Sequence, residues 1–240
     1  IMIAWGMQEL LSRWPYYRKI AIGISMVVVL TTLGISTRLQ ASYWKNNITL
    51  FSHAIEVTKN NYLAYANLGD ELCNQGKIAL SIECYKKSLQ IQSNSAYAHN
   101  NLGLALEQQG NYTEAVAHFT RAVQLMPDLG KARNNLAKAL CTQGRFDEAL
   151  AQFRAAIRLR PDWSALMNDF ALLMVTHPEL KSRDVNEAIR LASRACVLTN
   201  YKNTAFLSTL AVAYSSANRF SEAAQTLETA LNLDPNSAAL

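Results

Sequence analysis

The feature that most constrains this chain is a repeat of 34 residues that begins after residue 61. Four kinds of residue recur at this interval: a Leu followed by Gly or Ala, a second Gly, an aromatic residue and a small residue. In chain order they are Leu68-Gly69, Leu102-Gly103 and Leu136-Ala137; Gly76, Gly110 and Gly144; Tyr85, Phe119 and Phe153; and Ser88, Ala122 and Ala156. A period of this length predicts stacked supersecondary units, none of which buries its apolar face alone.

Each unit has the pattern of two antiparallel helices. In the second unit, Leu102 and Gly103 form a packing face on the first helix, and the glycine lets the second helix approach closely. Gly110 supplies the turn, because the end of a helix favours a positive φ that glycine adopts without strain. Phe119 on the second helix fills the space between the two helices. The repeat therefore predicts an all-α solenoid of helical hairpins.

The solenoid is expected over residues 44–240. The predicted units are a half unit at 44–61, then 62–95, 96–129, 130–163, 164–203 and 204–237. The fourth unit is longer, and its extra residues fall within 176–187, which predicts an elongated loop between its helices.

These residues resemble the tetratricopeptide repeat pattern, most specifically over 62–163 and acceptably to residue 240. The resemblance implies a right-handed superhelix whose first helices line a concave groove. It also implies that the groove binds peptides, extended segments or partner domains.

Asparagine recurs at one position of the expected groove, at Asn67, Asn101 and Asn135. The amide side chain offers both a donor and an acceptor, so such a ladder can hold a peptide backbone regardless of its sequence. It resembles the asparagine ladder of the O-linked N-acetylglucosamine transferase repeats. The alternative is that these residues brace the hairpins and bind no ligand. The same face carries three further candidate binding residues, Tyr97, Lys131 and Lys138.

A carboxylate clamp of the kind found in chaperone-binding repeats is rejected. Carried over position by position, it requires Lys at 66, Asn at 70 and 101, Lys at 131 and Arg at 135. This sequence has Ala66, Asp70, Asn101, Lys131 and Asn135, and the carboxylate of Asp70 would repel a partner's C-terminus.

Residues 20–37 form an uncharged apolar segment near the lower length limit for crossing a bilayer. Lys19 and Arg38 flank it, and aromatic residues stand near both ends, so we expect a transmembrane helix. Residues 13–19 are expected to form a basic turn, and residues 1–12 the end of a preceding span. The basic residues before the segment slightly outnumber those after it, which places the repeats on the extracytoplasmic side. The alternative is a buried core helix of a soluble domain.

The positive charge of the chain is concentrated near this segment. Residues 1–45 contain five Lys and Arg side chains and only Glu9 as an acid, so 46–240 carry a net charge of about +1 out of the total of +5. Membrane topology explains this distribution better than a nucleic-acid surface does, and nucleic acid is rejected as the main partner.

The remaining sequence gives no sign of chemistry. The four cysteines form no metal-ligand cluster, although a Cys73–Cys84 bridge stays open in an oxidising compartment. No hydrolase, phosphate-loop or zinc-protease motif is present, so neither catalytic residues nor a cofactor nor a metal is expected in this chain.

The order of the parts resembles the C-terminal part of polytopic membrane glycosyltransferases of the protein O-mannosyltransferase type. The distinctive portion is about residues 40–70, where YWKNNITLFSHAIEVTKNNYLAYANLG enters the repeats. The resemblance implies that extracytoplasmic repeats present acceptor proteins to a catalytic half upstream of Ile1. The alternative is a membrane-anchored scaffold that serves no enzyme.

Overall fold

The computed structural model describes residues 2–177, 179 and 184–234, with side chains from residue 19 onward except residue 21. These residues form α-helices joined by short turns, and none of them lies in a strand. The helices are α1 Met2–Tyr43, α2 Asn47–Val57, α3 Tyr62–Asn74, α4 Ile78–Ile91, α5 Ala96–Gln108, α6 Tyr112–Leu125, α7 Gly130–Thr142, α8 Phe146–Leu159, α9 Ser164–Thr176, α11 Val185–Leu198, α12 Thr204–Ser216 and α13 Phe220–Leu233.

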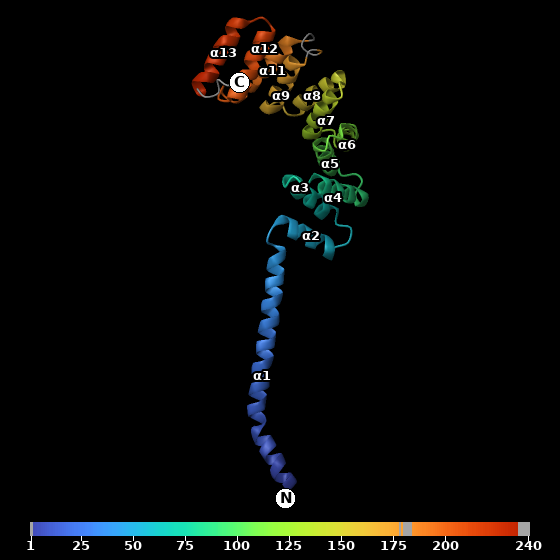
Figure 1. The fold of residues 1–240 in the computed structure, drawn as a ribbon, viewed down its shortest axis with the longest axis vertical. Helices are drawn as coiled ribbons and strands as arrows, with labels where there is room; N and C mark the ends of the chain where they lie inside the picture. The colour runs from blue at the N-terminus through green and yellow to red at the C-terminus, as the bar shows by residue number, and fades with distance from the viewer. Residues whose placement is uncertain (1, 178, 180–183, 235–240) are drawn as a thin grey trace.

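The helices from α3 onward pack as antiparallel pairs: α3 with α4, α5 with α6, α7 with α8, α9 with α11, and α12 with α13. Each pair stacks on the next, so the solenoid has one continuous core. Figure 1 shows the pairs following a curve, with α3 and α9 on its inner side. We call the pairs units one to five.

A residue in the left-handed conformation closes the hairpin turn in units one, two, three and five. Gly76 has a φ of +73°, and the backbone N–H of Lys77 donates to the carbonyl of Leu72 at 2.9 Å. This arrangement satisfies carbonyls that the end of α3 leaves free. In unit five, Asn218 occupies the same place with a φ of +60°, because asparagine tolerates this conformation better than most residues with a Cβ.

Close packing of an aromatic ring on a glycine joins the two helices of each of the first two units. A Cβ on Gly103 would lie 2.6 Å from Cε1 of Phe119, and one on Gly69 would lie 2.7 Å from Cε1 of Tyr85. Both rings are buried. In unit three the ring of Phe153 stacks on that of Phe170 in the next unit, with the centroids 4.9 Å apart. The aromatic residues therefore connect helices both within and between units.

The loop between α9 and α11 is longer than the three-residue turns of the other hairpins. It lies within the predicted elongated segment 176–187, of which residues 178 and 180–183 are outside the described part of the chain. Its end is fixed by Asp184, whose carboxylate accepts a hydrogen bond from the backbone N–H of Glu187 at 2.9 Å at the start of α11.

Helix α1 projects from the solenoid as a single long stalk (Figure 1). The turn predicted at 13–19 is wrong for this structure, because α1 continues as helix through these residues and joins 1–12 to the later segment. Proline at position 15 removes one backbone donor and bends a helix without necessarily ending it, and the segment contains no glycine. Figure 1 shows α1 bending near its N-terminal end.

The part of α1 that is long and apolar enough to cross a membrane is Ile22–Tyr43, of which none is buried in the protein. It starts close to the predicted 20–37 segment and extends beyond Arg38. Its 22 residues give a helix of about 33 Å, which matches the hydrocarbon thickness of a bilayer. The alternative of a buried core helix does not fit its exposed apolar side chains.

Candidate peptide-binding groove

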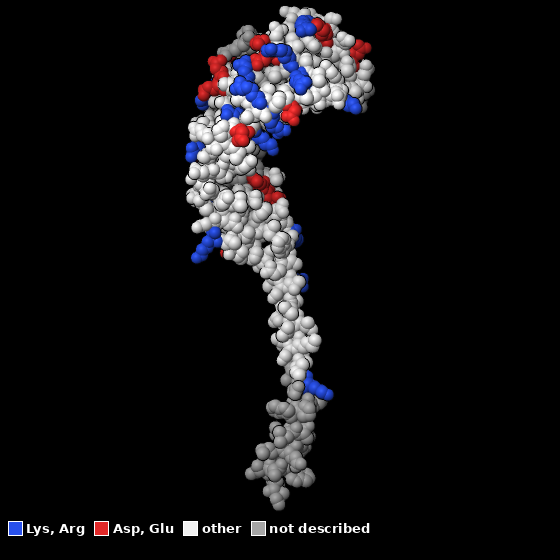
Figure 2. Space-filling model, turned by 180° about the vertical axis from the view of Figure 1, so that it is seen from behind, with Lys and Arg blue, Asp and Glu red and all other residues white. Residues whose placement is uncertain are grey.

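The inner face of the solenoid is built from the first helix of each unit. Hydrogen bonds or ion pairs connect these helices directly: α3 to α5, α5 to α7, and α7 to α9. Figure 2 shows the flank of the curved solenoid, with basic and acidic side chains intermingled over the part farthest from α1 and few charges next to α1. On the first helices, Lys131, Lys138 and Asp169 give the candidate groove a mixed charge.

At the N-terminal end of this face, Asp70 holds two donors. Its Oδ1 accepts from the hydroxyl of Tyr85 at 2.5 Å and from Nδ2 of Asn101 at 2.8 Å. Burial and the neighbouring carboxylate of Asp70 raise the pKa of the Tyr85 hydroxyl far above its usual range. The hydroxyl therefore stays a donor at all ordinary pH values, and Asp70 is fixed between units one and two.

The hydrogen-bonded chain continues through a pair of asparagines. Nδ2 of Asn100 donates to Oδ1 of Asn101 at 3.0 Å, and Oδ1 of Asn100 accepts from Nδ2 of Asn135 at 3.0 Å. Asn100 is buried, whereas Asn101 and Asn135 are half-buried. Asn101 and Asn135 thus connect neighbouring units. This is a structural role, like the one in the alternative that the asparagines brace the hairpins. We call the chain from Tyr85 to Asn135 the asparagine bridge.

The other predicted residues stay at the surface. Asn67, Tyr97 and Lys131 are exposed on the first helices, and Tyr97 is 61% exposed. Lys138 forms an ion pair with Asp169 of the next unit, and both side chains remain partly exposed. The repeat position shared by Asn67, Asn101 and Asn135 therefore has different surroundings in each unit, and an exposed binding role fits Asn67, Tyr97 and Lys131 best.

Sequence reasoning missed three buried asparagines one position before the predicted ladder. Asn100, Asn134 and Asn168 are 7%, 9% and 7% exposed. The signal was present as the paired Asn100-Asn101 and Asn134-Asn135, continued as Asn168-Asp169. Their burial could not be read from the repeat alone, because it depends on how closely the first helices of neighbouring units approach.

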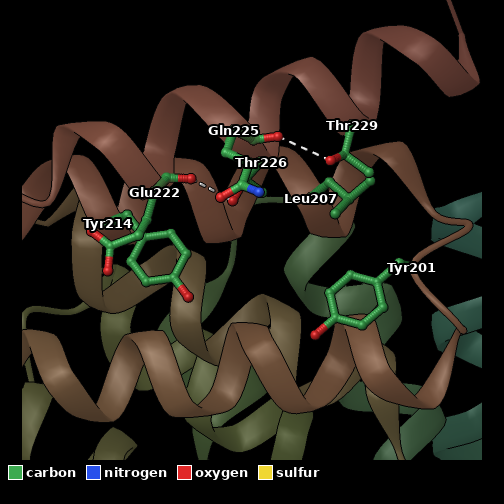
Figure 3. Close-up of a pocket in the computed structure, with 7 residues that line it drawn as sticks. All are labelled: Tyr201, Leu207, Tyr214, Glu222, Gln225, Thr226 and Thr229. Atoms are coloured by element: carbon green, nitrogen blue, oxygen red, sulfur yellow. Dashed lines mark hydrogen bonds between the residues drawn. The ribbon is translucent and has the colours of Figure 1, made fainter.

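A separate open pocket of about 320 Å³ lies at the last hairpin (Figure 3). The rings of Tyr201 and Tyr214 and the side chain of Glu222 line it. Arg219 pairs with the Glu222 carboxylate, and its guanidinium lies 4.7 Å from the ring centroid of Tyr214. The carboxylate of Glu222 is therefore already paired, and Gln225, Thr226 and Thr229 make the rest of the lining largely polar.

The side chains able to bind metals or perform redox chemistry are dispersed. In the part of the chain that the structure describes, no three His, Cys, Asp or Glu side chains are grouped so as to hold a metal ion. All four cysteines are free thiols in the structure, including Cys73 and Cys84, whose bridge the sequence left open. Burial raises the pKa of Cys141 and that of Cys196 to about 11, which keeps both thiols protonated and unreactive.

Comparison with known families agrees with this geometry. The family models described as "Tetratricopeptide repeat" match residues 94–162 and 179–240, and one described as "TPR repeat" matches 69–110. The chain is a tetratricopeptide repeat (TPR) protein. No curated protein sequence matches it.

Solved structures share the TPR fold with this chain. The crystal structure of YrrB, described as a TPR protein with an unusual peptide-binding site, is 19% identical with a TM-score of 0.63, covering 78% of this chain and 93% of YrrB. A crystal structure of MamA is 18% identical with a TM-score of 0.64, covering 75% of this chain and 96% of MamA. MamA from Desulfovibrio magneticus RS-1 is 16% identical with a TM-score of 0.64, covering 74% of this chain and 97% of that protein. At these identities the likeness establishes the fold alone.

Proposed function

We propose that this TPR protein is a membrane-tethered binding module whose inner face holds an extended segment of a partner protein. The observation that carries the proposal is the inner face itself, where Tyr97 and Lys131 are exposed on the helices that carry the partly buried asparagine bridge. A rigid polar floor with exposed aromatic and cationic side chains suits an extended peptide, because the ring supplies contact area and the floor supplies hydrogen bonds. The peptide-binding site named for YrrB supports the same use of the fold.

The tether is proposed from α1. Its apolar side chains are exposed, and Ile24, Met26 and Ile35 are each more than 60% exposed. An exposed apolar surface of this length is costly in water and favourable in a bilayer. Because α2 follows α1 almost directly, the repeats are held close to the membrane surface.

Substitutions on the inner face test the binding function. The full chain in lipid nanodiscs is used to select peptides from a displayed library of random 12-residue sequences. Tyr97→Ala and Lys131→Ala should each weaken binding of a selected peptide by about tenfold, because each removes an exposed contact. Arg158→Ala, on the exposed surface of α8, is the matched control and should leave the affinity unchanged. Equal affinity for all four proteins would contradict the inner face as the binding surface.

The more specific role, presenting acceptor proteins to a membrane glycosyltransferase on the extracytoplasmic side, is proposed from the resemblance of residues 40–70 alone. None of the comparisons adds support for it. A tag after Leu240 in sealed vesicles tests the topology that it requires. Protection of the tag from protease on the cytoplasmic side favours the transferase role, whereas cleavage favours a cytoplasmic membrane-anchored scaffold.

A further inference from the structure

The pocket at the last hairpin is separate from the candidate peptide-binding residues. Its lining comes from the turn between α11 and α12, from α12 and from α13, and none of the predicted inner-face residues belongs to it. Its volume of about 320 Å³ is near the lower limit for small-molecule sites, so it has room for one small ligand rather than for a long segment. Figure 3 shows the rings of Tyr201 and Tyr214 on the same side of α13, with both hydroxyls directed away from that helix.

Tyr201 has an unusual backbone conformation for an aromatic residue. The end of α11 is closed by Asn200, which has a φ of +50°, and the backbone N–H of Tyr201 donates to the carbonyl of Cys196 at 2.8 Å. Tyr201 then has a positive φ of its own, +55°, although the turns at 92–95, 126–129 and 160–163, which the structure describes fully, contain no such residue. A bulky side chain is strained in this conformation, whereas glycine adopts it freely. Because the ring is still 45% exposed, its burial does not offset the strain, and contact with a ligand explains why a tyrosine stands there.

The polar groups of the pocket have unused hydrogen-bonding capacity. The hydroxyls of Thr226 and Thr229 donate to carbonyls one turn earlier in α13, at 2.7 and 2.9 Å, so both oxygens remain available as acceptors. The phenol groups of Tyr201 and Tyr214 and the amide of Gln225 form no hydrogen bond with any residue that the structure describes. The pocket therefore offers both donors and acceptors to a ligand.

The lining favours a ligand that is neither charged nor wholly apolar. The carboxylate of Glu222 is paired with Arg219, whose guanidinium also covers one face of the Tyr214 ring, so neither charge is free for a ligand. An apolar ligand would leave the phenol and amide groups without partners, which lowers affinity. A ring that carries several hydroxyls meets both conditions. Each hydroxyl donates and accepts, and the C–H groups of the ring pack against an aromatic face.

We propose that this pocket binds one neutral sugar ring, with Tyr201 as the aromatic platform and with Gln225 and the Tyr214 hydroxyl as hydrogen-bonding groups. The hydroxyl oxygens of Thr226 and Thr229 accept from the sugar hydroxyls. The inference goes beyond peptide binding on the inner face and does not rest on it.

A ligand-observed NMR titration of the full chain in nanodiscs tests this site, because nanodiscs avoid detergents that have sugar headgroups. The probes are the methyl glycosides of glucose, galactose, mannose and N-acetylglucosamine. At least one of them should bind saturably with a Kd of about 1–10 mM, the range expected for so small a ligand. Gln225→Ala and Tyr201→Gly should each weaken this binding by about tenfold.

Two controls separate contact with the sugar from a loss of folding. Tyr201→Gly removes the ring and also relieves the strained backbone, so its Tm should be no lower than that of the wild type. Tyr112→Ala replaces an exposed tyrosine outside the pocket and should keep the wild-type affinity for the glycoside.

The outcomes decide the assignment. Absence of saturable binding by all four glycosides overturns it, and so does wild-type affinity in both Gln225→Ala and Tyr201→Gly, because the sugar then binds elsewhere. Weaker binding together with a lower Tm in both variants would show that binding follows stability, which also overturns it. A proline-rich 12-residue peptide is the competing probe, because aromatic grooves also bind such segments. If the two substitutions weaken binding of this peptide and no glycoside binds, the pocket is a peptide site instead.

Discussion

The contact between Gly103 and Phe119 gives the sharpest prediction about what stabilises the repeats. A methyl group at position 103 would lie 2.6 Å from Cε1 and 2.8 Å from Cδ1 of Phe119. The ring is 0% exposed, so it has no free space into which to move. Overpacking costs about 1–3 kcal/mol, and two ring atoms closer than 3.0 Å put this contact in the upper part of that range, at about 2–3 kcal/mol. Replacing glycine with alanine in a helix returns about 1 kcal/mol. Gly103→Ala should therefore reduce the free energy of unfolding by about 1–2 kcal/mol.

Thermal unfolding followed by circular dichroism measures this effect. For a domain of this size the loss corresponds to a fall in Tm of about 2–8 °C. Gly23→Ala is the matched control, because no heavy atom outside its own helix lies within 4 Å of the added Cβ, and it should leave the repeat transition unchanged. Combining Gly103→Ala with Phe119→Leu should restore part of the loss, since the smaller side chain makes room for the methyl group. A Gly103→Ala protein as stable as the wild type would refute the reasoning.

Three further perturbations follow from the contacts. His99 and His118 face each other with their Nδ1 atoms 2.9 Å apart, and burial lowers the pKa of both, His118 also through the charge of His99. The contribution of this histidine pair to the free energy of unfolding should be complete above the unfolded-state pKa of about 6.5, and it should be lost as the pH falls from there through the folded-state pKa. Urea unfolding at pH 7.5 and 5.5 should show this loss of stability. The loss should be smaller in His118→Gln. Tyr85→Phe should cost about 1–2 kcal/mol by thermal unfolding, because the carboxylate of Asp70 loses a hydroxyl donor, and an unchanged Tm would contradict that contact. Gly144→Ala should cost about 1 kcal/mol, because its φ of +72° strains any residue with a Cβ, and a stabilised variant would be inconsistent with this turn.

The sequence was sufficient for the hairpins because their signals are local. Gly76, Gly110 and Gly144 occupy the left-handed turn positions that the repeat predicts, and Phe119 packs on Gly103 as its spacing requires. In unit five, Asn218 rather than a glycine adopts the left-handed conformation at this turn. The turn at Asn218 was not predicted, because the expected turns were recognised by their glycines.

The groove could be predicted less completely, because its character depends on pairs of units. Asn101 and Asn135 occupy equivalent positions in the repeat, yet one donates to Asp70 and the other to Asn100. The unpaired oxygen of Asn134 follows from Asp169 in the next unit, a consequence of packing that no single unit reveals. For α1, the turn expected at 13–19 was an inference from the basic residues before the apolar segment, and positive charge alone does not end a helix.

Site-specific photo-cross-linking in membranes tests most directly whether the inner face binds a partner. A photoreactive amino acid is placed at Tyr97 or Lys131 on the inner face, and at Lys87 or Arg158 on the exposed surface of the second helices. The account predicts that the two inner positions cross-link to the same partner band, that the outer positions do not, and that excess selected peptide removes the band. Equal cross-linking from all four positions, or from the outer positions alone, would contradict it.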